Sequence, residues 1–425
     1  MPQRPISVLY FTNSSVRGGA EEHILTLLRG LDRKDFQSHL VCPAECAEKL
    51  RPDLPTDVEV IPLRLNKPSQ VGGAARFARI LRERNVGILH SHLFYSSLFA
   101  SPIGWLCRVP VIIETPHLRE AWRHGWLKGS FAIDRLVGRF VTRYIAVSEA
   151  NARYLVNQKG LAAKKVVVIQ NGCDLDRFSP NQPAPRDLKR SLGFDEGDPV
   201  LLVMARLEPQ KGHSVLLRAF PAVRSEFPRA RLVCAGEGVL RSELEGEARG
   251  LGIEEAVRFV GHKPNITDWL ALADMTVLPS FFEGLPLAAI ESLAASKPVV
   301  ATAVDGTPEV VVDGKTGLTV PPGDPICLAD AICRLLREPL LRQTLGQAGR
   351  EWVLDRFSRE RQIQRTQEFY LRAWAEKGEG LASATHEGQK TGQEDASQAM
   401  GTESRGVERE AEHQEARVTD KLLVS

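Results

Sequence analysis

The sequence lacks several features that mark specialised classes of protein. Its seven cysteines form no CxxC pair and no cluster with histidines at zinc-site spacing, so we expect reduced thiols in a reducing compartment. No run of about eighteen apolar residues is present, which argues against a membrane-spanning helix. The chain has 55 Lys and Arg and 53 Asp and Glu, so its net charge is only +2, which excludes a strongly basic nucleic-acid binder.

Nothing in the sequence indicates a secretion signal. The apolar stretch Ile6–Phe11 is short, and no small-residue cleavage site follows it. The apolar region Leu93–Ile113 is interrupted by serines, an arginine and two prolines, so it predicts a buried helix followed by a strand. We therefore expect a cytoplasmic protein.

What the sequence does have is the length and composition of an ordinary globular protein. With 425 residues, of which 43% are hydrophobic and 25% charged, it should form two or three domains. The net charge is +9 over residues 1–180 and −3 over residues 181–376. This uneven distribution indicates two units with different roles.

Short apolar runs alternate with longer amphipathic stretches in both halves of the chain. Most runs do not alternate polar with apolar residues, which is typical of parallel strands covered on both faces. The predicted strands are Ile6–Thr12, Ser38–Cys42, Val58–Pro62, Gly87–His90, Val111–Glu114, Tyr144–Val147, Val166–Ile169, Val200–Met204, Arg231–Ala235, Val257–Val260, Met275–Leu278, Pro298–Thr302 and Leu318–Val320. Two such series predict two doubly wound α/β domains.

Composition also predicts where the domains end. A stretch rich in proline and polar residues between 171 and 199 separates the halves. We predict a Rossmann-like domain over residues 1–178, a second over residues 179–355, and an amphipathic helix over residues 356–376. Residues 377–425 are rich in Gly, Glu, Gln and Ser, which predicts a disordered tail.

The most specific motif follows the predicted strand Met275–Leu278. Glu283 and Gly284 occupy a turn, and a helix is expected from about Pro286, with Glu291 inside it. Unpaired N–H groups at the helix start lie between the two carboxylates and suit phosphate oxygens. The motif therefore fits a ligand with hydroxyls at both ends and an anionic middle, as in a nucleoside-diphosphate sugar.

A diphosphate would need cations close to it. Arg206 follows the predicted strand Val200–Met204, and Lys211 lies on the same loop. Ligands of open α/β sheets bind at this edge of the sheet, where both side chains could stabilise charge on a leaving diphosphate. Outside this context, the same residues would indicate only a solvated basic loop.

Glycine pairs at the ends of predicted strands give a weaker signal. Gly18 and Gly19 precede a predicted helix, where backbone N–H groups could approach an anion, although such a pair is often only a turn. The pair does not fit the GxGxxG spacing. Gly236-Glu-Gly238 fails the same pattern, because Arg241 occupies the third glycine position. The sequence therefore argues against a dinucleotide cofactor and hydride transfer.

Three histidines stand at the ends of predicted strands. His90 and His92 follow one strand, and His117 follows the next. No carboxylate or cysteine stands near them at the spacing of a metal site, so no bound metal is expected. His117 could hydrogen-bond a sugar hydroxyl or polarise the reacting centre, and a structural role is the alternative for all three.

Together these features resemble the retaining glycosyltransferases of family 4. The resemblance spans about residues 5–375 and depends above all on Glu283-x7-Glu291 followed by Pro298-Val-Val-Ala. Weaker shared motifs are Gly18-Gly-Ala-Glu21, the strand exit at His117, Val147-Ser-Glu149, Val168-Ile-Gln-Asn171-Gly-Cys-Asp174, Arg206 to Lys211-Gly212, Gly236-Glu-Gly238 and Val257-Arg-Phe-Val-Gly261. The resemblance implies the GT-B fold: two doubly wound Rossmann-like domains facing across a cleft, with a C-terminal helix crossing back to the first.

The resemblance also implies a role for individual residues. Glu291 would bind the donor ribose, and Glu283 would lie beside the transferred sugar. Arg206 and Lys211 would hold the diphosphate, and His117 would contact the sugar near the reacting carbon. The expected catalytic residues are His117, Arg206, Lys211 and Glu283, and the expected donor-binding residues are Gly18, Gly19, Arg206, Lys211, Gly236, Gly284, Leu285, Leu287 and Glu291.

The reaction implied is the transfer of a hexose-type sugar from a nucleoside-diphosphate sugar to a hydroxyl acceptor, with retention of anomeric configuration. The first domain would hold the acceptor, expected to be a lipid-linked or other cell-envelope or exopolysaccharide saccharide, and the second domain the donor. The resemblance implies no metal and no other cofactor. Two positions depart from the family pattern: Ser296 replaces a glycine at a helix end, and Cys173 replaces an aliphatic residue.

Residues 118–143 indicate a further partner. The segment interleaves six basic residues with tryptophans and aliphatic residues, which suits the surface of an anionic membrane. We therefore expect peripheral docking on the inner face of the cytoplasmic membrane, with a core-packed helix that has a basic face as the alternative.

Other functions fit the sequence less well. A sugar-nucleotide 2-epimerase of the same two-domain plan would need no acceptor surface, and a phosphorylase would need a pyridoxal cofactor. A catalytically inactive protein that binds nucleotide sugars is the non-enzymatic alternative. The presence of Arg206, Lys211, Glu283 and Glu291 argues for an active transferase.

Overall fold

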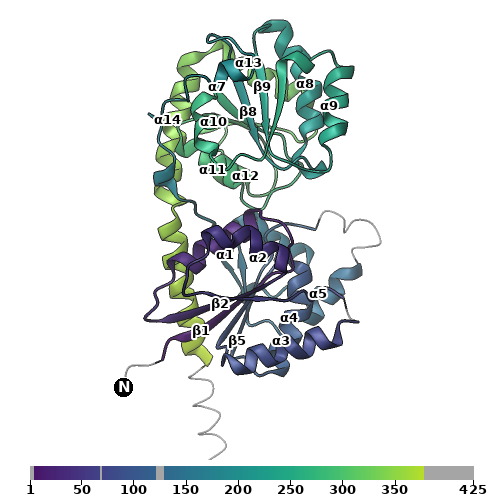
Figure 1. Ribbon diagram of the computed structural model, residues 1–425, viewed down its shortest axis with the longest axis vertical. Helices are drawn as coiled ribbons and strands as arrows, with labels where there is room; N and C mark the ends of the chain where they lie inside the picture. The colour runs from purple at the N-terminus through teal and green to yellow at the C-terminus, as the bar shows by residue number, and fades with distance from the viewer. Residues whose placement is uncertain (1–3, 68, 121–128, 378–425) are drawn as a thin grey trace, which may run out of the picture. The chain divides into compact units, whose positions relative to one another are not determined.

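The computed structural model describes residues 4–67, 69–120 and 129–377. These residues contain two parallel β-sheets, each with helices on both faces (Figure 1). The predicted tail, from residue 378 on, lies outside the described residues, as does part of the predicted membrane-docking segment, residues 121–128.

The first sheet has seven parallel strands in the order β3-β2-β1-β4-β5-β6-β7. The strands form where the chain is aliphatic without alternation, and the side chains of β1 from Val8 to Phe11 are fully buried. Val8 stands opposite Ser38 on one side and Ile88 on the other. The bounds are β1 (Ile6–Phe11), β2 (Phe36–Cys42), β3 (Glu59–Pro62), β4 (Ile88–His92), β5 (Val111–Thr115), β6 (Arg143–Ala146) and β7 (Val166–Val168).

Helices cover both faces of this sheet. Figure 1 shows α1 (Gly19–Gly30) and α2 (Ala44–Leu50) on one face, and α3 (Val71–Glu83), α4 (Phe94–Leu106) and α5 (Phe131–Val137) on the other. The short helix α6 (Glu149–Arg153) follows β6, and the Ser148 hydroxyl caps it by accepting the N–H of Asn151.

The second sheet has six parallel strands in the order β10-β9-β8-β11-β12-β13. Its strands are β8 (Val200–Met204), β9 (Arg231–Ala235), β10 (Val257–Gly261), β11 (Met275–Leu278), β12 (Val299–Thr302) and β13 (Gly317–Val320). The helices of this half are α7 (Leu188–Ser191), α8 (His213–Glu226), α9 (Arg241–Gly250), α10 (Ile266–Leu272), α11 (Leu287–Ala294), α12 (Thr307–Val310), α13 (Pro325–Arg337) and α14 (Pro339–Arg356).

Apolar packing fixes the helices against this second sheet. One cluster joins β8 to α8 and α13 through fully buried side chains such as Val203, Phe220 and Ile332. Each such side chain contributes roughly 1.5–3 kcal/mol by its removal from water. The sheet therefore provides a rigid support for the loops at its carboxyl edge.

All thirteen predicted strands are present, with ends that shift by at most two residues. One shift changes an interpretation: His90 and His92 were expected after a strand, but β4 extends through both because His92 pairs with Thr115 of β5. Helix α11 begins at Leu287, directly after Pro286. Ser296 adopts the left-handed conformation (φ 56°) at the position where the family pattern has glycine.

The strand order reverses at one point in each sheet, between β1 and β4 and between β8 and β11. Such switch points leave a crevice at the carboxyl ends of the strands, where ligands of open α/β sheets bind. The loops after β1, β8 and β11 carry most of the predicted site residues. The topology therefore predicts a ligand site at these loops.

The chain beyond α14 returns to the elements of the first sheet. Residues 359–377 are helical. The N–H of Cys173 donates to the carbonyl of Phe357 at 2.9 Å, and the side chain of Gln362 accepts the N–H of Gly172 at 2.7 Å. A Cβ on Gly30 would collide with Ile363, so α1 and this segment approach closely.

Candidate active site

A cavity of about 560 Å³ lies at the carboxyl ends of the strands next to both switch points. Its walls come from the loops after β1, β5, β8 and β11 and from helix α11. Nearly all residues predicted from the sequence to bind the donor or act in catalysis line this cavity: Gly18, Gly19, His117, Arg206, Lys211, Glu283, Gly284, Leu285, Leu287 and Glu291.

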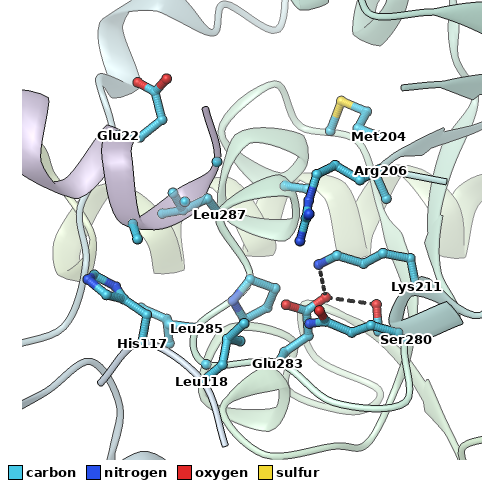
Figure 2. A pocket seen from close by; sticks show the side chains of 18 of the residues that line it. Glu22, His117, Leu118, Met204, Arg206, Lys211, Ser280, Glu283, Leu285 and Leu287 are labelled. Carbon is cyan, nitrogen blue, oxygen red and sulfur yellow. Dashed lines mark hydrogen bonds and ion pairs between the residues drawn. The ribbon is translucent and has the colours of Figure 1, made fainter. Parts of the chain in front are cut away.

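Lys211 and Glu283 form the central polar contact of the cavity wall. Lys211 Nζ donates to Glu283 Oε1 at 2.6 Å, and the hydroxyl of Ser280 donates to the same oxygen at 2.7 Å (Figure 2). The carboxylate is 8% exposed and the lysine side chain 18% exposed. Two donors therefore fix one carboxylate oxygen of Glu283, and the other remains available for a ligand hydroxyl.

Arg206 adds a second positive charge beside Lys211. Its guanidinium pairs with Glu208 and is 40% exposed. Figure 2 shows Arg206 and Lys211 side by side, with His117 on the opposite side of the cavity. A ligand with a diphosphate can therefore meet both cations while its sugar reaches toward His117.

Glycine is required where the turn after β11 meets the loop after β5. A Cβ on Gly284 would collide with the carbonyl oxygen of His117, and one on Gly306 would collide with the carbonyl oxygen of Gly284. Three backbone segments are therefore in direct contact at this point. Leu287 and Ala288, at the start of α11, line the cavity, so the unpaired N–H groups of this helix terminus lie beside it, where an anion could bind them.

His117 belongs to a buried group of four histidines. His92 Nδ1 and His117 Nε2 are 3.0 Å apart, so one imidazole donates to the other. The rings of His23 and His117 meet edge to face, with centroids 5.0 Å apart. Burial lowers the pKa of His23 to about 4 and holds the pKa values of His90, His92 and His117 well below the ordinary range. His117 is therefore a neutral hydrogen-bonding group at physiological pH.

Three of these histidines, His90, His92 and His117, were considered as metal ligands in the sequence, where no metal was expected. Across residues 4–67, 69–120 and 129–377, no group of His, Cys, Asp and Glu side chains has the arrangement of a metal site. His90 and His23 instead bind neighbouring polar side chains: His90 Nε2 lies 2.7 Å from the hydroxyl of Thr115, and His23 Nδ1 lies 2.7 Å from Asn171 Oδ1. His90 and His23 therefore fit a structural role, while His117 lies in the cavity lining.

Glu291 lies on α11 with its carboxylate at the cavity. In the described part of the chain, no side chain or backbone group forms a hydrogen bond with this carboxylate. Burial is the main cause that raises the pKa of Glu291 to about 7, partly offset by Arg177. A pair of ligand hydroxyls would supply the missing hydrogen bonds.

Glu21 is a cavity residue that the sequence argument did not assign. Its Oε2 accepts the N–H of Gly18 at 3.0 Å, so the third residue of α1 satisfies the N–H of the residue that caps the helix. The side chain is 2% exposed, and burial raises its pKa. Glu21 therefore holds the Gly18–Gly19 turn in place against the cavity.

Gly236 was predicted to bind the donor, but it does not line the cavity. It forms an isolated bridge with Gly261, and a Cβ on Gly236 would collide with the carbonyl oxygen of Ala205. The glycine is required because the loop after β9 packs directly against the loop that carries Arg206. Its role is packing beneath the site.

Sequence reasoning also missed Ser280 and Asp305. Ser280 stands three residues before Glu283, so its position at a strand exit was a usable signal. Asp305 Oδ2 accepts the N–H of Glu283 at 3.0 Å, but it follows a different strand, β12. Only the adjacency of β11 and β12 brings it to the site.

The described parts of the predicted membrane-docking segment, residues 118–120 and 129–143, differ in what they contact. Arg119 points toward the turn at Phe281, whose carbonyl accepts from its guanidinium at 3.2 Å, rather than toward a basic surface. In α5, Phe131 is buried, while Ile133 and Leu136 are 45% and 53% exposed. None of the described helices has both the length and the apolar character needed to cross a bilayer.

Family comparisons cover both halves of the chain. Residues 17–177 match the family described as Glycosyltransferase Family 4, and residues 186–352 match the family described as Glycosyl transferases group 1. The two matches together include nearly every element that surrounds the cavity.

Individual relatives agree with these matches. The glycogen synthase of Mycobacterium tuberculosis is 31% identical over 295 residues, which are 67% of this chain and 69% of the relative. The D-inositol 3-phosphate glycosyltransferase of Kribbella flavida is 32% identical over 287 residues, 62% of this chain and 66% of the relative. The chain thus matches about two thirds of the length of each relative.

Solved structures share the fold at lower identity. Anabaena HepE, crystallised with UDP and glucose, superposes with a TM-score of 0.75 at 22% identity, over 86% of this chain and 99% of HepE. A glycosyltransferase from Rickettsia africae gives a TM-score of 0.72 at 20% identity, over 87% of this chain and 98% of that protein. The two parallel-sheet domains therefore form a GT-B fold.

Proposed function

Because this chain belongs to the glycosyl transferases of group 1, within glycosyltransferase family 4, we propose that it transfers a hexose-type sugar from a nucleoside-diphosphate sugar to a hydroxyl group of a saccharide or lipid-linked acceptor, with retention of configuration. One observation carries the proposal: two cations, Arg206 and Lys211, and two carboxylates, Glu283 and Glu291, line a single cavity. The complex of HepE with UDP and glucose supports a donor of this chemical class.

The geometry suggests how such a donor would lie. The ribose hydroxyls would donate to the Glu291 carboxylate, which has no other hydrogen-bond partner in the described part of the chain. The diphosphate would then face Arg206, Lys211 and the N–H groups at the start of α11. The hexose would reach the free oxygen of Glu283 and the neutral imidazole of His117.

Charge stabilisation on the leaving group would be the main catalytic effect. The bond between the anomeric carbon and the diphosphate oxygen breaks, and the acceptor oxygen forms its bond on the same face of the sugar. The acceptor proton passes to the departing phosphate oxygen. Arg206 and Lys211 would supply the positive charge that this diphosphate requires, which is the role that a preorganised pair of cations performs best in a site shielded from water.

The location of the acceptor is a further part of the proposal. The loops after β1 and β5 form the wall opposite Arg206 and Lys211, and we assign the acceptor to that side. For an acceptor in a membrane, α5 offers the exposed apolar residues Ile133 and Leu136, next to the exposed cations Arg135 and Arg139. A cytoplasmic enzyme docked on an anionic membrane would use this combination.

A panel of UDP-, GDP- and ADP-sugars tests the proposed donor site. A ligand that binds only the folded protein raises its melting temperature in proportion to the logarithm of its concentration over Kd. We expect one nucleotide series to stabilise the protein and to be hydrolysed slowly without an acceptor. The proposed function would be rejected if no member of the panel raised the melting temperature of the wild type and none was hydrolysed.

A further inference from the structure

Two neighbouring residues in the loop after β5 contact different parts of the protein. Glu120 binds buried side chains of the first sheet's helices, and Arg119 reaches the turn that carries Glu283. Glu120 accepts from Lys159 Nζ at 2.8 Å and from the Tyr154 hydroxyl at 2.6 Å. Lys159 is 1% exposed and also pairs with Asp134 at 2.8 Å. These buried contacts anchor the loop to the first sheet and its helices, so the preceding residue, Arg119, projects from a fixed point.

Arg119 makes two contacts with the turn that carries Glu283 and one with Asp305, on the loop after β12. Its Nη2 donates to the carbonyl of Phe281 at 3.2 Å, and its guanidinium lies over the ring of Phe282 at 5.7 Å. Its Nε lies 3.3 Å from Asp305 Oδ2. One side chain from the loop after β5 therefore touches the loops after both β11 and β12.

Asp305 transmits this contact to Glu283. The oxygen that faces Arg119 also accepts the backbone N–H of Glu283 at 3.0 Å. The backbone of Asp305 has φ 41°, a conformation that glycine adopts freely and that Asp and Asn tolerate better than other residues. The position thus combines a glycine-like conformation with a carboxylate that makes two specific contacts.

We propose that Asp305 is a positioning residue for Glu283 and that Arg119 in turn fixes Asp305. Neither residue lines the cavity, so neither would touch the donor. Because Asp305 holds the main chain of Glu283, the carboxylate stays where Lys211 and Ser280 bind it. This inference rests on the proposed function and extends it to two residues outside the cavity.

Glu309, in the short helix α12 that follows Asp305, provides a matched control. Its carboxylate accepts the N–H groups of Glu149 and Ala150 at 3.1 and 2.9 Å, and the side-chain amide of Gln170 at 3.0 Å. It therefore joins α12 to loops of the first sheet, as Asp305 joins its own loop to Arg119, but among the described residues its carboxylate makes no hydrogen bond or ion pair with the Glu283 turn. A variant of Glu309 loses hydrogen bonds to the first sheet's loops but none to the Glu283 turn.

Four variants separate positioning from general stability. Asp305→Gly removes the carboxylate without strain at this φ, whereas Asp305→Asn keeps an oxygen that can accept the Glu283 N–H. Arg119→Met removes the charge of the guanidinium, its hydrogen bond to the Phe281 carbonyl and its contact with the Phe282 ring. Glu309→Ala is the control that breaks the parallel contact.

Steady-state kinetics with the donor identified in the nucleotide-sugar panel gives the first measurement. We expect Asp305→Gly to lower kcat between about tenfold and a hundredfold, because small displacements of a catalytic group have effects of this size. The donor KM should change less than about threefold, since Asp305 does not contact the donor. Asp305→Asn should retain most of the kcat, Arg119→Met should fall between the two Asp305 variants, and Glu309→Ala should remain near wild type.

Hydrogen–deuterium exchange of the ligand-free protein gives a measurement that needs no activity. The amide of Glu283 should exchange faster in Asp305→Gly and Arg119→Met than in wild type, and at the wild-type rate in Glu309→Ala. Unchanged exchange and kcat in Asp305→Gly would overturn the inference, as would equal losses in Asp305→Gly and Glu309→Ala. A wild type without transferase activity but with the expected exchange pattern would reject the proposed function alone.

Discussion

Lys211 and Glu283 are 72 residues apart in the sequence, and their charged groups lie 2.6 Å apart in the wall of the cavity. Each neutralises the other before a donor binds. A bound diphosphate would compete with Glu283 for the lysine, and a sugar hydroxyl would compete with Lys211 for the carboxylate. The pair thus links recognition of the phosphate to recognition of the sugar.

Loss of either cation should reduce turnover strongly. We expect Arg206→Ala and Lys211→Ala each to lower kcat by roughly a hundredfold or more, in line with the loss of one preorganised donor to a developing charge. Lys315→Ala is the control, because Lys315 is an exposed lysine that does not line the cavity. Steady-state kinetics measures kcat for each variant. Near-wild-type kcat in both single variants would show that neither Arg206 nor Lys211 takes part in catalysis.

Donor binding should depend on pH through Glu291. Because the pKa of Glu291 is raised to about 7, its carboxyl is largely protonated at pH 6 and ionised at pH 8. The ionised form accepts two ribose hydroxyls, so donor affinity should rise by up to about tenfold between these pH values. Calorimetric titration of wild type and Glu291→Gln measures this. The variant should bind more weakly and without pH dependence, and an equal pH dependence in both proteins would contradict the assignment.

The contact between Gly284 and His117 should not tolerate a side chain. A Cβ at Gly284 would collide with a carbonyl oxygen, so Gly284→Ala must displace either the turn or the loop after β5. We expect turnover to fall about a hundredfold or more. Gly72→Ala is the control, because nothing lies within 4 Å of a Cβ at that helical position. It should be neutral or slightly stabilising, and a Gly284→Ala enzyme as active as the control would disprove the close approach.

Stability should fall at high pH because of Glu114. Burial is the main cause that raises the pKa of Glu114 to about 8 from 4.5, and Lys159 opposes this effect while Asp134 and Glu120 add to it. Between these pH values the folded protein keeps a proton that the unfolded chain releases, so this group destabilises the fold as pH rises through the window. Glu114→Gln should melt a few degrees above wild type at pH 9 and close to it at pH 5. Calorimetry measures both melting temperatures from pH 5 to pH 9. If the difference between Glu114→Gln and wild type were the same at every pH, the prediction would be refuted.

Membrane docking through α5 should depend on charge and on apolar contact. We expect co-sedimentation with phosphatidylcholine vesicles only when they contain phosphatidylglycerol. The double variant Arg135→Gln/Arg139→Gln and the single variant Leu136→Ser should each reduce it several-fold. All three side chains are exposed, so the fold should be unaffected, as circular dichroism can verify. Binding to neutral and anionic vesicles alike would rule out the docking surface.

Local sequence carried enough information for the strands and for much of the site. Apolar runs without alternation predicted all thirteen strands, because burial on both faces leaves the same signature in any parallel sheet. Glu283, Gly284, Leu287 and Glu291 could be placed together because they share one strand–turn–helix unit. Arg206 and Lys211 could be placed beside them because carboxyl ends of parallel strands share one edge of the sheet.

Tertiary structure alone decided which residues support that site. Arg119 reaches a carbonyl 162 residues away, and Asp305 serves Glu283 from the end of the neighbouring strand. Gly236 matched a local pattern, yet the path of the chain places it beneath the loop of Arg206 rather than in the cavity. Periodicity and turn chemistry act over a few residues, whereas these contacts depend on which loops the packing of whole sheets and helices brings together.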